Sequence, residues 1–502
     1  MKKSIKMKLP GILSIIVIIV LTAPALSSCK LIHQKKRADK NREADRIKPW
    51  SENTRYWQYK GEPVMLLGGT DQDNLFNHPN MEPDGLEAHL DLLVSVGGNY
   101  VRNTMSSRDR KDSTSIYFND NNIYPFQLDQ ESGLYDLEKF NESYWYRLEQ
   151  FLDMTARRDV IVQMEIWDRW DYSGDRQPNY LAFGWSENPY NPKNNINYSA
   201  EETGLDTMQW YGHPIFRTIP ELDSVPVVLS YQEKFADKLL SITLKYDHIL
   251  YCISNESDAT EEWSRYWATF IRDRAKNKGI NIEVTEMWNH WDLSNSAHKR
   301  TFDNPGLYSF TDISQNNHQP GQIHWNNMQS ARELITDPPR PMNNVKIYGG
   351  DIHGGGLTEG ADKFWRNILG GCASARFHRP GKVPGYYGAG LSELAQTQIR
   401  SAGMFLESFD IFMSKPDPES FLLTNREENE AYLSFIPDSQ YAIYFPDGGS
   451  AGLDPGIEQE RIFSLQWLDI TNSKWSDEIV VRAEGTIEVT TPGRGQWIAL
   501  IK

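Results

Sequence analysis

Hydrophobic residues along this chain recur in short continuous runs that alternate with longer amphipathic segments. Residues 249–253 are apolar at every position, which predicts a strand buried on both faces, as in a parallel sheet covered by helices. The segments 231–245 and 261–272, before and after this run, repeat apolar residues at helical spacing. The run ends in the polar stretch 254–257. This order of helix, buried strand, polar strand end and helix is typical of a βα fold, in which the functional residues lie at the carboxyl ends of the strands.

The same alternation of strands and helices repeats from residue 49 to about residue 415 and predicts an α/β fold, a (β/α)8 TIM barrel. A polar or aromatic cluster follows each of the first six strands, more regularly than solvated loops alone would predict. The predicted strands are 64–67, 99–103, 159–168, 249–253, 280–288, 306–311, 341–349 and 370–379. The predicted helices are 85–96, 141–157, 231–245, 261–272, 361–369 and 391–406.

Two further regions differ from this pattern. Residues 169–225 form a long insertion rich in Asn, Pro, Trp and Tyr, and its aromatic residues indicate either a binding wall or a packed structural loop. Residues 416–502 contain short alternating stretches separated by turn signals such as Asp447-Gly-Gly and Pro492-Gly. The alternation predicts a small antiparallel β-sandwich of about seven or eight strands.

The N-terminus has the pattern of an export signal. A basic segment, residues 2–8, precedes the apolar core 12–21, which is too short for a spanning helix and predicts a signal peptide over residues 1–28. The sequence Leu26-Ser-Ser-Cys29 resembles a bacterial lipobox, which implies that Cys29 is lipidated. An ordinary secretory signal that ends near a cysteine is the alternative. With residues 29–48 as a tether, we expect a membrane-anchored lipoprotein outside the cytoplasm, in the periplasm or at the outer membrane or cell surface.

Composition narrows the classes of partner and cofactor. A net charge of −16 argues against nucleic acid as a partner, because there is no basic surface to neutralise phosphates. Cys252 and Cys372, the cysteines other than Cys29, lie on predicted strands four and eight, which face each other across the barrel. A disulfide requires Cα atoms within about 7 Å, so buried free thiols are favoured. The sequence contains neither a Cys-x-x-Cys nor a His-Glu-x-x-His motif, and we expect neither a metal nor another cofactor.

The Asn255-Glu256 pair at the end of predicted strand four resembles the signature of the retaining glycosidases built on TIM barrels. In that family the Glu is the general acid/base, and the Asn binds the sugar hydroxyl next to the reacting carbon. Arg102, on predicted strand two, resembles the family's arginine that binds the catalytic nucleophile. The alternative is a helix N-terminus capped by Ser257 or Asp258, with Glu256 merely solvated.

Strand seven departs from the family pattern. The family has a catalytic Glu there, followed by an aromatic-Gly step, whereas this chain has Val345, Lys346 and Ile347 before Tyr348-Gly349. The first carboxylate beyond them is Asp351, in a glycine-rich stretch that would let the backbone fold the acid back over the barrel mouth. Glu165, Asp168, Asp71, Glu286 and Glu359 are the alternatives for the second acid. Carboxyl separation, about 5–5.5 Å for retaining and 6.5–9.5 Å for inverting enzymes, decides between the mechanisms.

Two longer phrases extend the resemblance to nearly all of residues 50–502. Residues 55–64, Arg-Tyr-x-x-Tyr-Lys-Gly-x-Pro-Val, and residues 370–380 are similar to the apiosidase-type glycoside hydrolases. In that wider family a small module named for collagen binding follows the barrel, and residues 444–449, 467–470 and 495–500 resemble it. We interpret this module as a packing or glycan-contacting accessory domain.

The resemblance implies a glycoside hydrolase that cleaves a polysaccharide or a glycan side chain with paired carboxylates, Glu256 as general acid/base and Asp351 as the second acid. A general acid needs a pKa raised toward the working pH. The alternative is a non-catalytic glycan-binding lipoprotein on a degenerate barrel. The cationic end of strand eight, which includes Arg376 and His378, would bind an acidic sugar or keep the catalytic carboxylates ionised. The expected substrate-binding residues are Asp71, Arg102, Asn255, Glu165, Trp167, Trp288, His290, His318 and Arg379.

Overall fold

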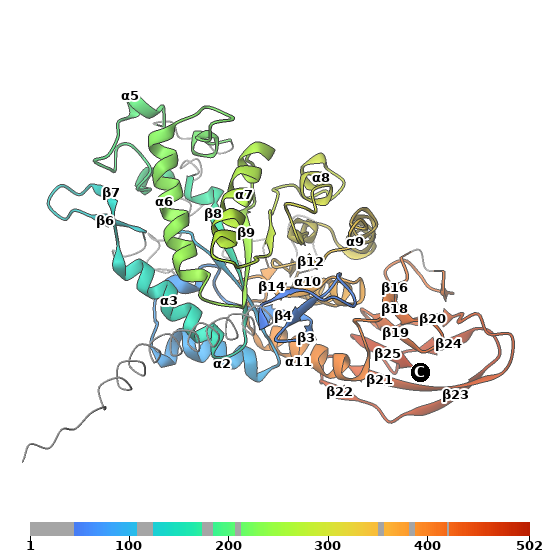
Figure 1. The fold of residues 1–502 in the computed structure, drawn as a ribbon. Coiled ribbons are helices and arrows are strands. Elements are labelled where there is room, and N and C mark those ends of the chain that lie inside the picture. Colours follow the sequence, from blue (N-terminus) through green and yellow to red (C-terminus); the bar gives the residue numbers. More distant parts are fainter. Residues whose placement is uncertain are drawn as a thin grey trace, which may run out of the picture. The chain divides into compact units, whose positions relative to one another are not determined.

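The computed structural model describes residues 45–107, 124–172, 184–205, 212–349, 356–380, 387–418 and 421–502. Residues 47–502 form one compact unit (Figure 1). The predicted signal peptide, Cys29, most of the predicted tether and the candidate acid Asp351 lie outside the described residues, as do Trp210 and Tyr211 of the insertion. Among the described residues, no helix has both the length and the apolar character needed to cross a membrane.

Eight parallel strands form the barrel. Six of them pair in the order β10-β9-β8-β5-β4-β14, and β11 pairs with β12. The amide of Ser309 donates to the carbonyl of Val284 (3.0 Å) and that of Ala373 to Met342 (2.7 Å), which joins the two sheets on both sides. The TIM barrel predicted from the sequence is therefore confirmed. Its strands are β4 (Leu66–Gly69), β5 (Tyr100–Thr104), β8 (Ile161–Asp168), β9 (Ile249–Asn255), β10 (Val284–Thr285), β11 (Thr311–Asp312), β12 (Met342–Asn343) and β14 (Ser374–Phe377).

The helices cover the outside of the barrel with their apolar faces inward. In α7, Thr260 caps the N-terminus by accepting from the Trp263 amide, and Trp267 and Ile271 continue the buried face at helical spacing. Two helices, α8 and α9, lie in regions where the apolar pattern did not predict a helix. The main helices are α2 (Ala88–Ser95), α3 (Glu142–Ala156), α6 (Pro226–Thr243), α7 (Glu261–Asn277), α8 (Ser296–Phe302), α9 (Gly321–Leu334), α10 (Gly356–Leu369) and α11 (Glu393–Ser408).

An N-terminal hairpin packs against the barrel. Its strands β2 (Trp57–Tyr59) and β3 (Glu62–Val64) turn at Lys60 and Gly61, both with positive φ, and β1 (Lys48–Pro49) pairs with β2. The indole of Trp57 is fully buried, and its Nε1 donates to Asn343 Oδ1 on β12 at 2.9 Å. The N-terminal segment 55–64 thus supplies a side chain, Trp57, to the barrel interior.

The insertion after β8 is a packed structure wherever the chain is described. The side chains of Tyr172, Trp185 and Tyr190 are at most 5% exposed. Its asparagines hydrogen-bond to the backbone of their own turns; the Asn191 side chain, for example, donates to the Trp185 carbonyl and accepts from the Lys193 amide. These contacts favour the packed structural loop over an exposed binding wall. The insertion contains η3 (Arg169–Tyr172), α4 (Gly184–Glu187), α5 (Ala200–Thr203) and η4 (Pro214–Arg217), and it packs beside the hairpin of β6 (Phe126–Leu128) and β7 (Tyr135–Phe140).

The C-terminal region is the predicted β-sandwich, but its described residues form ten strands instead of the seven or eight expected. On β19, Tyr441, Ile443 and Phe445 face the sandwich core, whereas Ala442 and Tyr444 belong to the core shared with the barrel. The Tyr444 hydroxyl donates to Asp362 Oδ1 of α10 at 2.7 Å. Period-two alternation therefore gives this sheet two buried faces. One sheet holds β16 (Lys415–Pro416), β18 (Tyr432–Ile436), β19 (Gln440–Phe445), β25 (Trp497–Ile501), β21 (Arg461–Asp469), β22 (Lys474–Trp475) and β23 (Ile479–Ala483), and the other holds β17 (Leu423–Thr424), β20 (Ser450–Leu453) and β24 (Ile487–Thr490).

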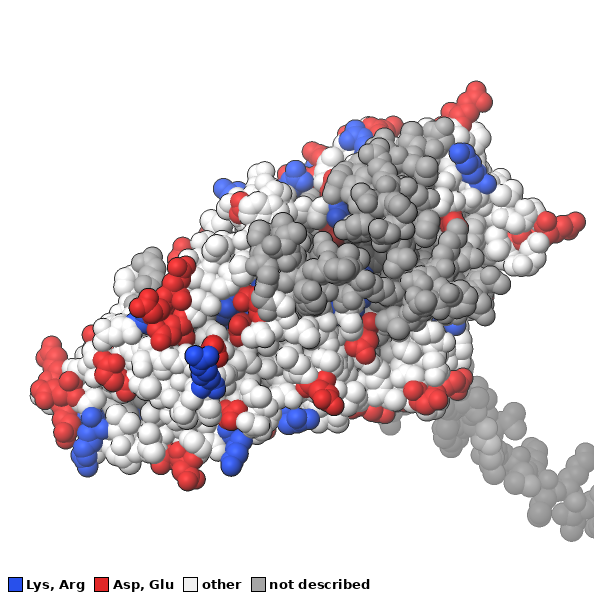
Figure 2. Space-filling view, turned by 180° about the vertical axis from the view of Figure 1, so that it is seen from behind, with Lys and Arg blue, Asp and Glu red and all other residues white. Residues whose placement is uncertain are grey.

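The two cysteines of the barrel agree with the sequence analysis. Cys252 and Cys372 are both buried and free. On the face shown in Figure 2, acidic and basic side chains are interspersed, and the described Lys and Arg residues form no continuous basic surface there.

Candidate active site

Glu256 stands directly after β9, and its backbone adopts a left-handed conformation with φ of 50°. The side chain is 21% exposed, while Asn255 before it is buried. Trp170 Nε1 donates to Glu256 Oε2 at 2.9 Å, and Arg169 Nη2 lies 3.3 Å from the same oxygen. A non-glycine residue with positive φ is held there by its surroundings, and such residues cluster at functional sites.

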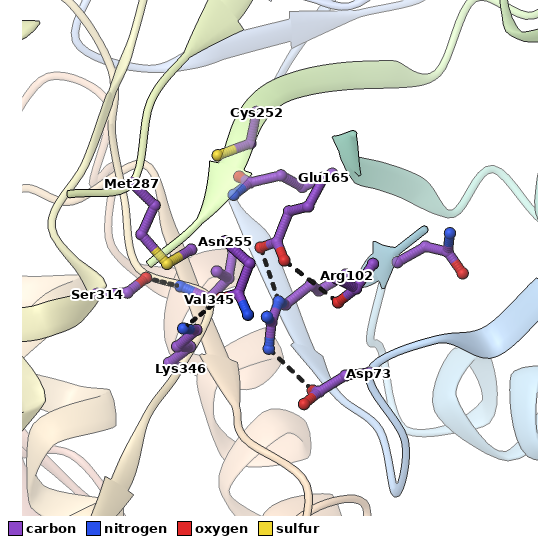
Figure 3. A network of polar contacts seen from close by, with 12 residues as sticks. Asp73, Arg102, Glu165, Cys252, Asn255, Met287, Ser314, Val345 and Lys346 are labelled. Atoms are coloured by element: carbon purple, nitrogen blue, oxygen red, sulfur yellow. Dashed lines mark hydrogen bonds and ion pairs between the residues drawn. The ribbon is translucent and has the colours of Figure 1, made fainter. Parts of the chain in front are cut away.

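Lys346, after β12, contacts both residues of the Asn-Glu pair. Its Nζ donates to Asn255 Oδ1 and to Glu256 Oε1, each at 2.6 Å. Asn255 Nδ2 in turn donates to Asp168 Oδ1, at the end of β8, at 2.9 Å. Figure 3 shows Lys346 pointing toward Asn255 from the segment that follows β12. An ammonium group therefore contacts Glu256 from the region where the family resemblance implies a second carboxylate.

The charges around Glu256 decide its protonation state. Burial raises the pKa of the Glu256 carboxyl, but the Lys346 ammonium and the Arg169 guanidinium outweigh burial and hold that pKa well below its usual range. Burial lowers the pKa of Lys346, and the Glu256 carboxylate opposes this effect. The resting site contains an ionised Glu256, which is the opposite of what a general acid needs.

A second network surrounds Arg102 (Figure 3). Arg102 Nε donates to Glu165 Oε1 at 2.7 Å, and Arg102 Nη1 lies 3.0 Å from Asp73 Oδ1. Arg379 Nε donates to the other oxygen of Asp73 at 2.7 Å, and Thr104 donates to Glu165. Arg102, Glu165 and Asp73 are almost completely buried. Arg102 thus binds two carboxylates. Asp73 follows the first strand of the barrel, and Glu165 lies on the third.

Glu286 follows β10 and is fully buried. Its Oε1 accepts from the Ser254 amide at 2.8 Å and from the Met287 amide at 3.0 Å. Burial raises the pKa of the Glu286 carboxyl to about 8. This carboxyl joins the ends of β9 and β10 beneath the Asn-Glu pair.

The two tryptophans expected to bind substrate lie in the interior. Trp167 is 2% exposed and packs against Phe235 and Trp267, with ring centroids 5.3 and 4.9 Å away. Trp288 is 1% exposed, and its Nε1 donates to Thr301 Oγ1 at 2.7 Å. Both indoles are core side chains in this structure, because Trp167 packs against residues of α6 and α7 and Trp288 donates to Thr301 of α8.

The remaining candidates are spread around the barrel mouth. His318 shares a 3.0 Å hydrogen bond with the Tyr348 hydroxyl, and Asp71 accepts from the Leu391 amide at 2.8 Å. His290 is half-buried and accepts from the Asp292 amide at 3.1 Å. Arg376 donates to the Val345 carbonyl and to Thr70, inside the barrel. The structure brings together Glu256, Asn255 and Asp168 in one network, and Arg102, Glu165 and Arg379 in another.

Sequence reasoning did not assign site roles to Arg169, Trp170, Asp73 and Lys346. Arg169 and Trp170 directly follow strand three, so the rule that strand ends carry the chemistry would have found them. Lys346 departs from the family pattern in the sequence, but its contact with Glu256 joins residues 90 positions apart. Among the described residues, no group of three or more His, Cys, Asp or Glu side chains is arranged to hold a metal ion.

Comparisons with known proteins give the same fold. No family model and no curated protein sequence matches the chain. A solved structure described as a glycoside hydrolase matches with a TM-score of 0.60 and 14% identity over 92% of this chain and 97% of its own. A glycoside hydrolase family 5 protein of Bacteroides vulgatus matches with a TM-score of 0.60 and 12% identity over 92% and 94%. A family 5 mannosidase of Rhizomucor miehei matches with a TM-score of 0.50 and 14% identity over 74% and 99%. The chain therefore has the barrel fold of glycoside hydrolases.

Proposed function

We propose that the protein is a glycosidase that hydrolyses O-glycosidic bonds in a polysaccharide or a glycan side chain, with Glu256 as its essential carboxylate. The observation that carries the proposal is the placement of Glu256. It is a partly exposed carboxylate at the end of a barrel strand, in a left-handed backbone conformation, and it is held by donors from two other segments. Carboxylates at strand ends are the catalytic groups of most glycosidases, and the barrel fold is that of such enzymes.

An ionised Glu256 can act as a general base but not as a general acid. An ionised carboxylate can deprotonate water or attack the anomeric carbon, but it has no proton to give to the leaving group. A second group must then protonate the glycosidic oxygen. We propose Asp351 for that group, because it is the first carboxylate after strand seven in the sequence.

The test is a cleavage screen of the chain without residues 1–28 against a panel of polysaccharides and oligosaccharides. Glu256→Gln and Asp351→Asn are screened alongside, with Glu221→Gln as the control for loss of an exposed carboxylate in an ion pair. Cleavage lost in both site variants and retained in the control supports the proposed pair. Loss with Glu256→Gln alone transfers the second role to Glu165, Asp168 or Glu359.

One observation favours a second candidate function, a glycan-binding protein without activity. Lys346 occupies the region where the family has its second carboxylate, and its ammonium forms an ion pair with the Glu256 carboxylate. Glycan binding measured by calorimetry, combined with no cleavage under any condition, would establish this alternative. Retained binding in a cleavage-deficient Glu256→Gln variant would instead support the enzyme.

We also propose that the protein is a membrane-anchored lipoprotein outside the cytoplasm, linked through a lipid on Cys29. The support is the basic, apolar and small-residue order of residues 2–29. Radiolabelled palmitate should be incorporated into the wild-type chain and not into Cys29→Ala. Equal labelling of both proteins would contradict this proposal.

A further inference from the structure

We propose that Lys346 is a positioning residue, which orients Glu256 and keeps it ionised for its work as a base or nucleophile. This inference rests on the proposed function of Glu256. It also supplies what that function lacks, a reason for a lysine after strand seven of a glycosidase barrel.

The geometry shows that Lys346 acts on the Asn-Glu pair as a unit. One ammonium group donates to Asn255 Oδ1 and Glu256 Oε1, so it fixes the relative orientation of two adjacent side chains. The Lys346 side chain is 4% exposed, and the Asn255 side chain is held from its other end by Asp168. Charge-assisted hydrogen bonds of 2.6 Å in a buried setting are strong and directional.

The backbone that carries Lys346 is itself fixed. The Val345 amide donates to Ser314 Oγ at 2.9 Å, and the Lys346 amide donates to Asn344 Oδ1 at 3.2 Å. The Asn344 amide donates to Ser374 Oγ on β14, also at 2.9 Å. These side-chain contacts hold the strand-seven end between its two neighbouring strands, so that the ammonium group is preorganised.

The 2.6 Å distance between Lys346 Nζ and Glu256 Oε1 excludes Lys346 as the second catalytic group. The two catalytic groups of a glycosidase flank the sugar and are separated by about 5 Å or more, whereas Lys346 Nζ is in direct contact with Glu256. A proton on Lys346 is therefore bound toward Glu256, on the same side of the site. Lys346 acts through that carboxylate.

Three described charges face Glu256. Arg169 follows β8, Lys346 follows β12, and Asp258 lies two residues further along the same chain as Glu256. Lys346 also faces the Arg102 and Glu165 charges. Among the described groups, removal of the ammonium would leave Glu256 with the Arg169 guanidinium, the Trp170 indole donor, the neighbouring Asp258 and its burial, and burial favours the protonated form.

The test is a 13C NMR titration of the chain without residues 1–28, labelled at the glutamate side-chain carboxyl carbons. The Glu256 resonance is assigned as the one that Glu256→Gln removes. We expect wild-type Glu256 to stay ionised well below the pH at which exposed glutamates titrate, and Lys346→Arg to preserve this behaviour. In Lys346→Met the inflection should move to higher pH. Lys363→Met is the matched control, because Lys363 is also buried but donates to the carbonyls of Asn317 and Tyr348.

The outcomes separate this inference from the proposed function. An unchanged Glu256 inflection in Lys346→Met, with near-UV circular dichroism showing a folded protein, overturns the inference. An equal shift in Lys363→Met also overturns it, because the effect would then be general to buried cations. The pH profile of cleavage adds a second readout, in which Lys346→Met should move the acidic limb to higher pH. A protein that cleaves no glycan refutes the proposed function, while the titration still decides whether Lys346 controls Glu256.

Discussion

Two glutamates at the ends of neighbouring strands, Glu256 after β9 and Glu286 after β10, have opposite electrostatic behaviour. Glu256 is partly exposed, contacts two cations and has a pKa well below its usual range. Glu286 is fully buried, accepts two backbone amides and has a pKa raised to about 8. Among the described residues, no Lys or Arg forms an ion pair with Glu286.

The comparison shows that burial alone does not assign a role to a carboxylate. Burial raises the pKa of both groups, but only at Glu256 do cationic partners reverse the effect. Glu286 near neutral pH is a neutral structural hydrogen-bonding group, whereas Glu256 is an anion available to a ligand. The two sites should therefore respond to mutation in different measurements.

The largest expected effect is on catalysis. Glu256→Gln should reduce kcat by roughly a thousandfold on any glycan that the wild type cleaves, because an amide cannot act as a base or nucleophile. Glycan binding should remain, since the amide keeps the shape of the carboxyl group. Kinetics and calorimetry on the same glycan measure the two quantities. A variant that keeps more than a tenth of the wild-type kcat would remove Glu256 from the mechanism.

At Glu286 the main effect should be on stability. Glu286→Ala removes the acceptor of two buried amides, Ser254 and Met287, and should lower the free energy of unfolding by about 3 kcal/mol. Chemical denaturation followed by fluorescence measures this change. Glu286→Gln is the matched control, because its amide oxygen still accepts both hydrogen bonds. Equal destabilisation by Ala and Gln would contradict the hydrogen-bonding role.

The sequence contained enough information to predict the barrel and the position of Glu256. The continuous apolar run of β9 and the amphipathic faces of α6 and α7 are local patterns, so their elements could be recognised without tertiary information. The first strand was predicted slightly too early, at 64–67, whereas β4 covers Leu66–Gly69. Its Gly68 permits close packing, because a Cβ there would lie 1.9 Å from the Tyr100 carbonyl oxygen.

The chemistry of the site depends on contacts that local patterns do not contain. Whether Trp167 and Trp288 face the substrate or the helices depends on packing at the strand ends that strict alternation does not predict, since Trp167 has the parity of the inward-facing Glu165 but packs against helices. The pairing of Arg102 with Glu165 and Asp73 depends on which side chains the barrel brings into contact. The protonation state of Glu256 likewise depends on Lys346 and Arg169, which lie far from it in the sequence.

The pH dependence of stability should sharpen the contrast between the two glutamates. Glu286 has a folded-state pKa above its unfolded value, so its contribution to stability is fully present below about pH 4.5 and is lost as the pH rises toward 8. Between pH 5 and pH 7 the difference in unfolding free energy between wild type and Glu286→Gln should fall by about 1.4 kcal/mol per pH unit. Urea unfolding of both proteins across this range measures the slope. A constant difference would show that Glu286 is ionised in the folded protein.

The smallest expected effect has the opposite sign and belongs to Glu256. Its folded-state pKa lies below the unfolded value, so its contribution to stability is present above about pH 4.5 and is lost as the pH falls through the folded pKa. Relative to Glu256→Gln, the wild type should therefore lose at most about 0.7 kcal/mol between pH 5 and pH 4, because protonation of the unfolded-state carboxyl sets this limit and water screens the ion pairs of the partly exposed side chain. The same urea experiment, extended to acidic pH, measures this loss. If the wild type instead gains stability relative to Glu256→Gln as the pH falls, burial outweighs Lys346 and Arg169, and Glu256 resembles Glu286 after all.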